Sequence, residues 1–215
     1  MPPEEKPWSR KGRSYMRPVD HIQKRKRYLI VCEGRKTEPN YFRGFKIPPD
    51  AVVEICGEGY NTVSLVEKAI QLRDIAKDVD EEYDKVWCVF DRDSFSAQDF
   101  NKAIELAQNE DIDIAYSNEA FELWYVLHFD YLDTGITRQD YCNILSRQLK
   151  KGYRKNSESI YSEIRHLQDM AIQRARRLYE QYPNHNPEKD KPSTTVHLLV
   201  EELNKLNRDK YGKKQ

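Results

Sequence analysis

Two short apolar segments, each followed by acidic residues, constrain most strongly what this chain can fold into. Residues 28–32 (YLIVC) run into Glu33, and residues 86–90 (VWCVF) run into Asp91 and, two positions on, Asp93. A segment without charged side chains is typical of a strand buried on both faces, as in the middle of a parallel sheet. Such a sheet needs helices on both sides, so the two segments predict an α/β protein.

The remaining pattern of the first 130 residues agrees with this fold class. Two further strand-like segments, 51–56 and 112–116, alternate with helical segments at 37–45, at 62–77 and from Ser96 onward. This spacing predicts a mostly parallel sheet with right-handed crossovers. Three residues are predicted to begin the helices as N-caps, which are Thr37, Thr62 and Ser96.

The pattern changes after the fourth strand. Residues 118–129 are rich in aromatic side chains and predict a buried helix, and only helices are expected beyond them, among them one from 159 to 182 and one from 193 to 206. Thr137 and Asp140 have the spacing of a capping box. The organisation expected is a flexible basic segment (1–27), an α/β core (28–130), a helical extension packed on it (131–208) and a basic tail (209–215).

The distribution of charge is more informative than its sum. Lysine plus arginine and aspartate plus glutamate both number 36, so the net charge indicates no partner. Residues 1–27 and 146–177, however, each hold nine basic and three acidic side chains. A phosphate-rich partner such as DNA or RNA would favour these segments. Solvated helix faces and a disordered tail explain them equally well. The candidate contacts to nucleic acid are Arg35, Lys36, Arg174, Arg176 and Arg177.

Cysteine spacing and hydropathy indicate the compartment. The four cysteines form no C-x-x-C pair, and three of them lie in apolar segments. They are interpreted as buried thiols in a reducing compartment. No signal-peptide pattern and no apolar run of membrane-spanning length is present. The sequence therefore predicts a cytoplasmic protein without membrane contact.

The acids after the first and third strands define a candidate metal site. The carboxyl ends of parallel strands meet at one rim of the sheet, so Glu33, Asp91 and Asp93 are expected to lie together. Like charges at one point repel one another unless a cation or a shared proton relieves them. Oxygen ligands suit Mg²⁺, or Mn²⁺ in its place. The alternative is that the aspartates cap the turn and helix that follow.

Four motifs occur along the chain in the same order as in a known protein family. They are VCEGRKTEPNYF, VFDRDSF, SNEAFELWYVLHF and KPSTTVHLLVEEL, spread over about residues 28–206. Together they resemble the RloB-like family, which is associated with abortive infection and restriction loci in bacteria. The core of that family is similar to the Toprim fold of topoisomerases, primases and overcoming-lysogenization-defect (OLD) nucleases.

The resemblance implies roles for particular residues. At Glu33 it implies a general acid/base that can also touch metal, and at Asp91 and Asp93 the metal ligands. OLD-like nucleases add two acids, to which Glu38 and Glu122 correspond, and these would permit a second metal. A Tyr-x-Lys of the family corresponds to Lys155, which would stabilise charge on the transferred phosphate.

Two functions from different classes follow. The first is a Mg²⁺-dependent nuclease that hydrolyses phosphodiester bonds of DNA or RNA in antiviral defence and is controlled by a partner ATPase, as the resemblance implies. The second is a subunit that binds nucleic acid or protein and has lost the chemistry. The sequence leaves the oligomeric state open, a homo-oligomer included.

Overall fold

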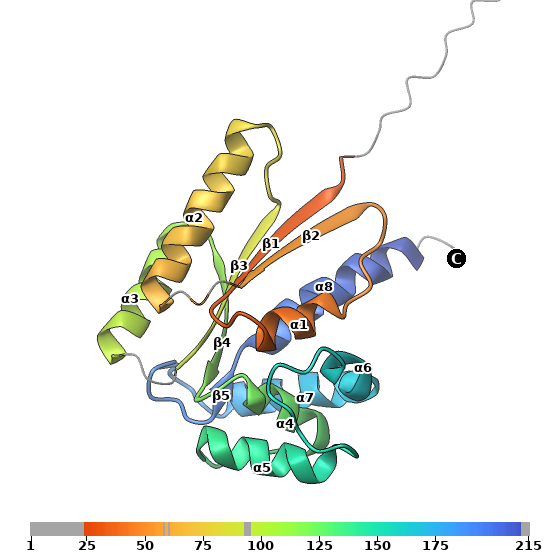
Figure 1. Ribbon diagram of the computed structural model, residues 1–215. Coiled ribbons are helices and arrows are strands. Elements are labelled where there is room, and N and C mark those ends of the chain that lie inside the picture. Colours follow the sequence, from red (N-terminus) through yellow and green to blue (C-terminus); the bar gives the residue numbers. More distant parts are fainter. Residues whose placement is uncertain (1–23, 58, 60, 93–95, 212–215) are drawn as a thin grey trace, which may run out of the picture.

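A computed structural model of the chain describes residues 24–57, 59, 61–92 and 96–211, with the side chains of 208–211 excepted. Within these residues five strands form one sheet in the order β2-β1-β3-β4-β5 (Figure 1). The first four pair in parallel and β5 runs antiparallel to β4. The strands are β1 (Lys26–Cys32), β2 (Ala51–Gly57), β3 (Lys85–Asp91), β4 (Asp113–Asn118) and β5 (Ser193–Thr194).

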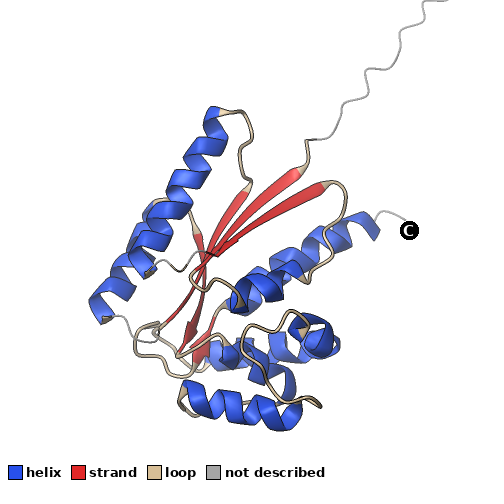
Figure 2. Cartoon of the chain, viewed as in Figure 1, coloured by secondary structure: helices blue, strands red, loops and turns tan. Residues whose placement is uncertain are grey.

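Helices cover both faces of this sheet, which confirms the predicted α/β class. Figures 1 and 2 show α2 (Thr62–Asp78) and α3 (Ala97–Asn109) on one side, and α1 (Thr37–Arg43) and α8 (Val196–Tyr211) on the other. Alternate side chains of β1 enter two separate cores. Leu29 and Val31 pack under α2 and α3, whereas Tyr28, Ile30 and Cys32 face the larger core under α1 and α8. A strand buried on both faces explains why residues 28–32 carry no charge.

The larger core extends under the remaining helices. Tyr41 of α1 makes ring contacts with Phe42, Phe121, Trp124 and Tyr125, and all five are fully buried. This cluster joins the start of the sheet layer to the helices that follow it. Those helices are α4 (Glu122–Phe129), α5 (Arg138–Gln148), α6 (Ile160–Ile164), the 3₁₀ helix η1 (Arg165–Leu167) and α7 (Gln168–Glu180).

Two expectations for the region beyond residue 130 are wrong. Ser193–Thr194 is a strand and not the start of the last helix, because it pairs with the end of β4 and Thr194 Oγ1 donates to the carbonyl of Tyr116 at 3.0 Å. Two polar residues are too short a pattern to indicate a strand without knowledge of this neighbour. The helix predicted at 159–182 is divided by η1, which turns the chain between α6 and α7.

Two predicted N-caps are also displaced by one residue. Thr37 is the first residue of α1, and Lys36 before it makes no side-chain cap. Thr62 is the first residue of α2, and Asn61 is the cap, because its side-chain oxygen accepts the N–H of Ser64 at 2.9 Å. Asparagine and threonine both serve as caps, so the pattern did not separate them.

The other two helix starts are confirmed. Ser96 caps α3 by accepting the N–H of Asp99. Thr137 and Asp140 form the capping box at the start of α5, with the side chain of each bonded to the backbone of the other. The start of α5 is therefore well defined, which matters below because its first residue enters the candidate site.

The expectation of buried thiols is met in part. All four cysteines are free, but only Cys32 and Cys88 are buried, whereas Cys56 and Cys142 are half-buried. None of the helices within the described residues combines the length and the apolar character needed to cross a membrane. Residues 1–23 of the predicted basic segment, Asp93 and residues 212–215 of the tail lie outside the described part of the chain.

Candidate metal centre

Four acids border a pocket of about 680 Å³ at the carboxyl ends of β1 and β3. Its wall comes from the loops after β1 and β2, the end of β3, the first residues of α1, α4 and α5, and the loop that follows α5. Both the α/β core and the helical extension therefore contribute. The lining residues are Glu33, Gly34, Arg35, Lys36, Thr37, Glu38, Gly59, Asn61, Asp91, Glu122, Arg138, Lys155 and Asn156.

The register of the sheet brings Glu33 and Asp91 together. β1 and β3 are parallel neighbours, with Cys32 opposite Val89. The Glu33 N–H extends the ladder by donating to the carbonyl of Val89 at 2.9 Å. The Glu33 carboxylate then accepts the N–H of Asp91 at 3.1 Å. The two acids lie on the same rim, as the strand pattern predicted.

Glu38 reaches the same pocket because the chain turns sharply after Glu33. A side chain at Gly34 would place its Cβ 2.0 Å from Glu38 Oε2, so glycine leaves the space that this carboxylate occupies. Glu38 is 5% exposed, and Oε2 has no hydrogen-bond partner. Burial, with the nearby charge of Glu122 adding to it, raises the pKa of Glu38 to about 7. A buried carboxylate oxygen without a donor is costly unless a cation or proton satisfies it.

Asp91 shows the same signature. It is 8% exposed, and its Oδ1 is buried without a hydrogen-bond partner. Burial raises the pKa of Asp91 well above its usual range, and the charges of Glu38, Glu122 and Glu33 raise it further. The alternative that Asp91 caps the next helix is not supported, since Ser96 fills that position.

Glu122 is the first residue of α4 and is 2% exposed. A buried carboxylate needs partners, and the helical extension supplies them. The Tyr153 hydroxyl donates to Glu122 Oε1 at 3.0 Å. On the other side, Arg138 Nε lies 4.0 Å from Glu122 Oε2.

The loop after α5 closes the pocket and carries Lys155. Its neighbour Asn156 is fixed to α1, because Thr37 Oγ1 donates to Asn156 Oδ1 and Asn40 Nδ2 donates to Asn156 O, both at 3.0 Å. Lys155 lines the pocket, and its charge opposes the burial that raises the pKa of Glu38. Lys155, which the sequence predicted as a site residue, therefore lies in the same pocket as the acids.

Among the charged residues of the pocket lining, Arg138 is the one that sequence reasoning missed. Its Nη2 donates to Asp91 Oδ2 at 3.2 Å. It belongs to no recognised motif and is 47 residues from Asp91 in sequence. The one local feature that marks it is its position directly after the Thr137 cap. That cap shows where α5 begins, but it does not show which strand end Arg138 contacts.

The donor set suits a hard divalent cation. Glu33, Glu38, Asp91 and Glu122 present carboxylate oxygens, and two of these, Glu38 Oε2 and Asp91 Oδ1, are buried without hydrogen-bond partners. Mg²⁺ and Mn²⁺ prefer such ligands and take few of them directly. In the part of the chain that the structure describes, no three His, Cys, Asp or Glu residues converge as a ligand set for one ion. The residues fit a Mg²⁺ site in their chemistry.

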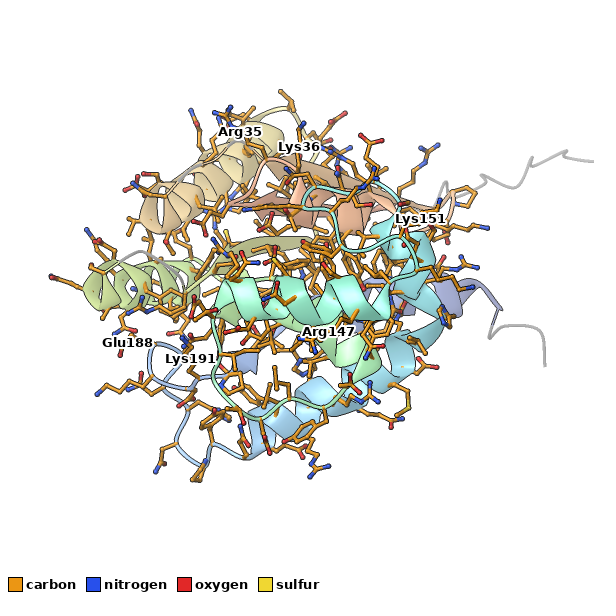
Figure 3. All side chains as sticks on the ribbon, turned by 60° about the horizontal axis from the view of Figure 1, so that its bottom comes forward. Arg35, Lys36, Arg147, Lys151, Glu188 and Lys191 are labelled. Carbon is orange, nitrogen blue, oxygen red and sulfur yellow. The ribbon has the colours of Figure 1, made fainter. Side chains whose placement is uncertain are left out.

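The candidate nucleic-acid contacts fall into two groups. Arg35 and Lys36 are exposed and line the pocket, and Figure 3 shows them projecting outward from the loop after β1. The three arginines of α7 do not line it. Arg174 donates to the carbonyls of Leu127 and His128, Arg176 pairs with Glu201, and Arg177 lies 4.2 Å from the centre of the Tyr131 ring.

Fold and site together define an α/β protein with a cluster of carboxylates at the carboxyl rim of a parallel sheet. The chain belongs to the RloB-like family, because the family model for RloB-like proteins matches residues 28–203. That match includes β1 from Tyr28 onward, the whole of the other four described strands and every residue that lines the pocket. Neither the comparison with curated proteins nor the comparison with solved structures gave a match. Membership of the family suggests a protein associated with phage defence.

Proposed function

We propose that the protein is a metal-dependent nuclease that hydrolyses phosphodiester bonds of DNA or RNA in bacterial antiviral defence. The observation that supports this most is the pair of buried, unpartnered carboxylate oxygens of Glu38 and Asp91 in one pocket. Four acids gathered at the carboxyl ends of parallel strands make an electrostatically unfavourable arrangement without a cation. Mg²⁺ or Mn²⁺ would relieve it.

The residues around the pocket suit this reaction. Glu33, Glu38, Asp91 and Glu122 would hold the ion, one or two of them directly and the others through bound water. The ion would polarise the phosphodiester and lower the pKa of an attacking water. The Glu33 carboxylate, held by the N–H of Asp91, is positioned to take or give a proton at the rim. Lys155 lines the same pocket, where its ammonium group would stabilise charge that develops on the transferred phosphate. Asp93 would complete the set.

The setting of this activity is inferred from the family. The α/β architecture is compatible with the Toprim fold, whose enzymes carry a glutamate after the first strand and a D-x-D after the third. A nuclease that attacks host or phage nucleic acid is toxic when it is always active. We therefore propose that a partner ATPase encoded beside it controls the cleavage.

A cleavage assay tests the proposal. The full chain is incubated with Mg²⁺ or Mn²⁺, with plasmid DNA or with tRNA, in the presence and absence of the neighbouring ATPase. Wild-type protein should cut at least one substrate, and Asp91→Asn should reduce the rate by at least about 100-fold, since it removes a group that acts in the transition state. The matched control is Asp113→Asn. Asp113 starts β4 at the opposite end of the sheet, where it pairs with Lys85, and its loss should leave the rate unchanged.

The outcomes separate the two classes of function. Nucleic-acid binding without cleavage under all of these conditions would support a non-catalytic subunit and refute the nuclease. Equal loss of activity in Asp91→Asn and Asp113→Asn would show that the pocket is not the reaction centre.

A further inference from the structure

We propose that Arg138 is a built-in counter-cation that competes with the divalent ion for Asp91 and Glu122. The inference rests on the metal site of the proposed function and adds to it a residue that sets the affinity of that site. In the metal-free protein the guanidinium lies among the acids, and its positive charge opposes the binding of the ion.

The contacts of Arg138 place it between two of the four carboxylates. Nη2 is 3.2 Å from Asp91 Oδ2, and Nε is 4.0 Å from Glu122 Oε2. Both acids are almost fully buried, so their charges are poorly screened by water. An arginine with its fork between two such carboxylates lowers the energy of their ionised forms and makes the metal-free pocket tolerable.

The pairing is nevertheless incomplete in a way that leaves room for an ion. Arg138 bonds one oxygen of Asp91, whereas the other, Oδ1, is buried without a partner. A guanidinium on one oxygen of a carboxylate repels a divalent ion on the other, and the low exposure of these acids leaves that repulsion poorly screened. Binding of a divalent ion is therefore weakened while the guanidinium stays in place and is strengthened when it moves away.

The side chain of Arg138 has solvent beside it into which it can turn. The backbone of Arg138 is fixed, since it follows the Thr137–Asp140 capping box and its N–H donates to Glu119 Oε1 at 3.4 Å. Its side chain is 35% exposed, so the outer part of it already borders solvent. Rotation about the side-chain bonds moves the guanidinium toward the pocket mouth without disturbing α5.

Mn²⁺ binding by isothermal titration calorimetry tests the inference on the full chain, without substrate. Arg138→Gln should bind Mn²⁺ more tightly than wild type, on the order of tenfold, as expected when a competing site charge is removed. Arg138→Lys keeps the charge and should stay near wild type. The control is Arg147→Gln, nine positions along α5, which is exposed, bonds the carbonyl of Asn143 and lies outside the pocket lining (Figure 3).

A melting experiment in EDTA supplies the second reading. Arg138→Gln should melt at a lower temperature than wild type, because its acids lose their counter-cation, and Arg147→Gln should not. Tight Mn²⁺ binding by wild type with equal or weaker binding by Arg138→Gln would overturn the counter-cation role and leave the nuclease proposal standing. Absence of Mn²⁺ binding in wild type, Arg138→Gln and Asp91→Asn alike would overturn the metal site itself, and the inference with it.

Discussion

At the scale of one residue, Glu38 shows that the pocket disfavours the ionised form of its acids. Its carboxyl is buried beside the charge of Glu122, and its pKa is raised from 4.5 to about 7. A carboxyl whose folded pKa lies above its unfolded pKa destabilises the protein in the pH range where the unfolded chain ionises more readily. The penalty is absent below pH 4.5, grows between pH 4.5 and 7, and is constant above pH 7.

The first prediction follows from this sign. In EDTA, Glu38→Gln should match wild type in the free energy of unfolding near pH 4.5 and exceed it above pH 7. A pKa shift of one unit corresponds to about 1.4 kcal/mol, so a shift from 4.5 to about 7 gives a gain on the order of 3 kcal/mol. Urea unfolding from pH 4.5 to 8 measures it, and the exposed Glu105→Gln on α3 is the control. A variant that is less stable than wild type at pH 8 would contradict the assignment of Glu38 as a strained acid.

The start of α5 shows at the scale of one element how a local motif serves a distant site. Thr137 and Asp140 determine where the helix begins, and Arg138 is its first residue. The Thr137 side chain accepts the N–H of Asp140 and also donates to its carboxylate at 2.7 Å. The capping box thus holds the backbone from which Arg138 reaches Asp91.

The second prediction concerns that box. Thr137→Ala should lower the free energy of unfolding by about 1 kcal/mol, the usual cost of losing an N-cap. In the Thr137→Ala protein, adding Arg138→Gln should also raise the Mn²⁺ affinity by less than it does in wild type, because a frayed helix start holds the guanidinium less firmly. Thr134→Ala, exposed and before the helix, is the control. Unchanged stability of Thr137→Ala in urea would show that the box does not hold this end of α5.

The elements also show what the sequence could and could not predict. The first four strands follow from apolar segments that alternate with helical ones, and the meeting of Glu33 and Asp91 follows from the two charge-free segments 28–32 and 86–90. Glu38 and Glu122 entered through family motifs. Arg138 and the strand β5 were not predictable, since each depends on a partner far along the chain, Asp91 for the arginine and β4 for the strand. Local patterns carry no information about such pairings.

At the scale of the whole molecule, the acidic pocket is bordered by basic side chains from two distant parts of the chain. The acids lie inside the pocket, whereas Lys36 and Lys155 are exposed residues of its lining, one from the α/β core and one from the extension. A nucleic-acid backbone that enters between them would meet cations before it meets the carboxylates. The second basic region, on α7, has intramolecular partners in Glu201 and the Tyr131 ring.

The last prediction decides which region tracks the backbone. Each phosphate contact contributes about 0.9 to the slope of log affinity against log salt concentration for duplex DNA. Lys36→Ala with Lys155→Ala should therefore weaken binding and reduce the magnitude of that slope by about 2. Arg176→Ala with Arg177→Ala removes the same number of charges from α7 and should change the slope by less than about half as much. Fluorescence anisotropy with labelled DNA and RNA in EDTA, at several salt concentrations, measures both.

Each of the two double variants removes two positive charges, so a difference between their salt slopes shows which region of the surface contacts the nucleic acid. Arg174 is left intact because its guanidinium holds the carbonyls of Leu127 and His128 at the end of α4, and its loss would confuse folding with binding. A flatter slope for the α7 pair than for the pocket pair would place the nucleic acid over α7. The scissile phosphate would then need another route to Asp91, and the proposed direction of entry would be wrong.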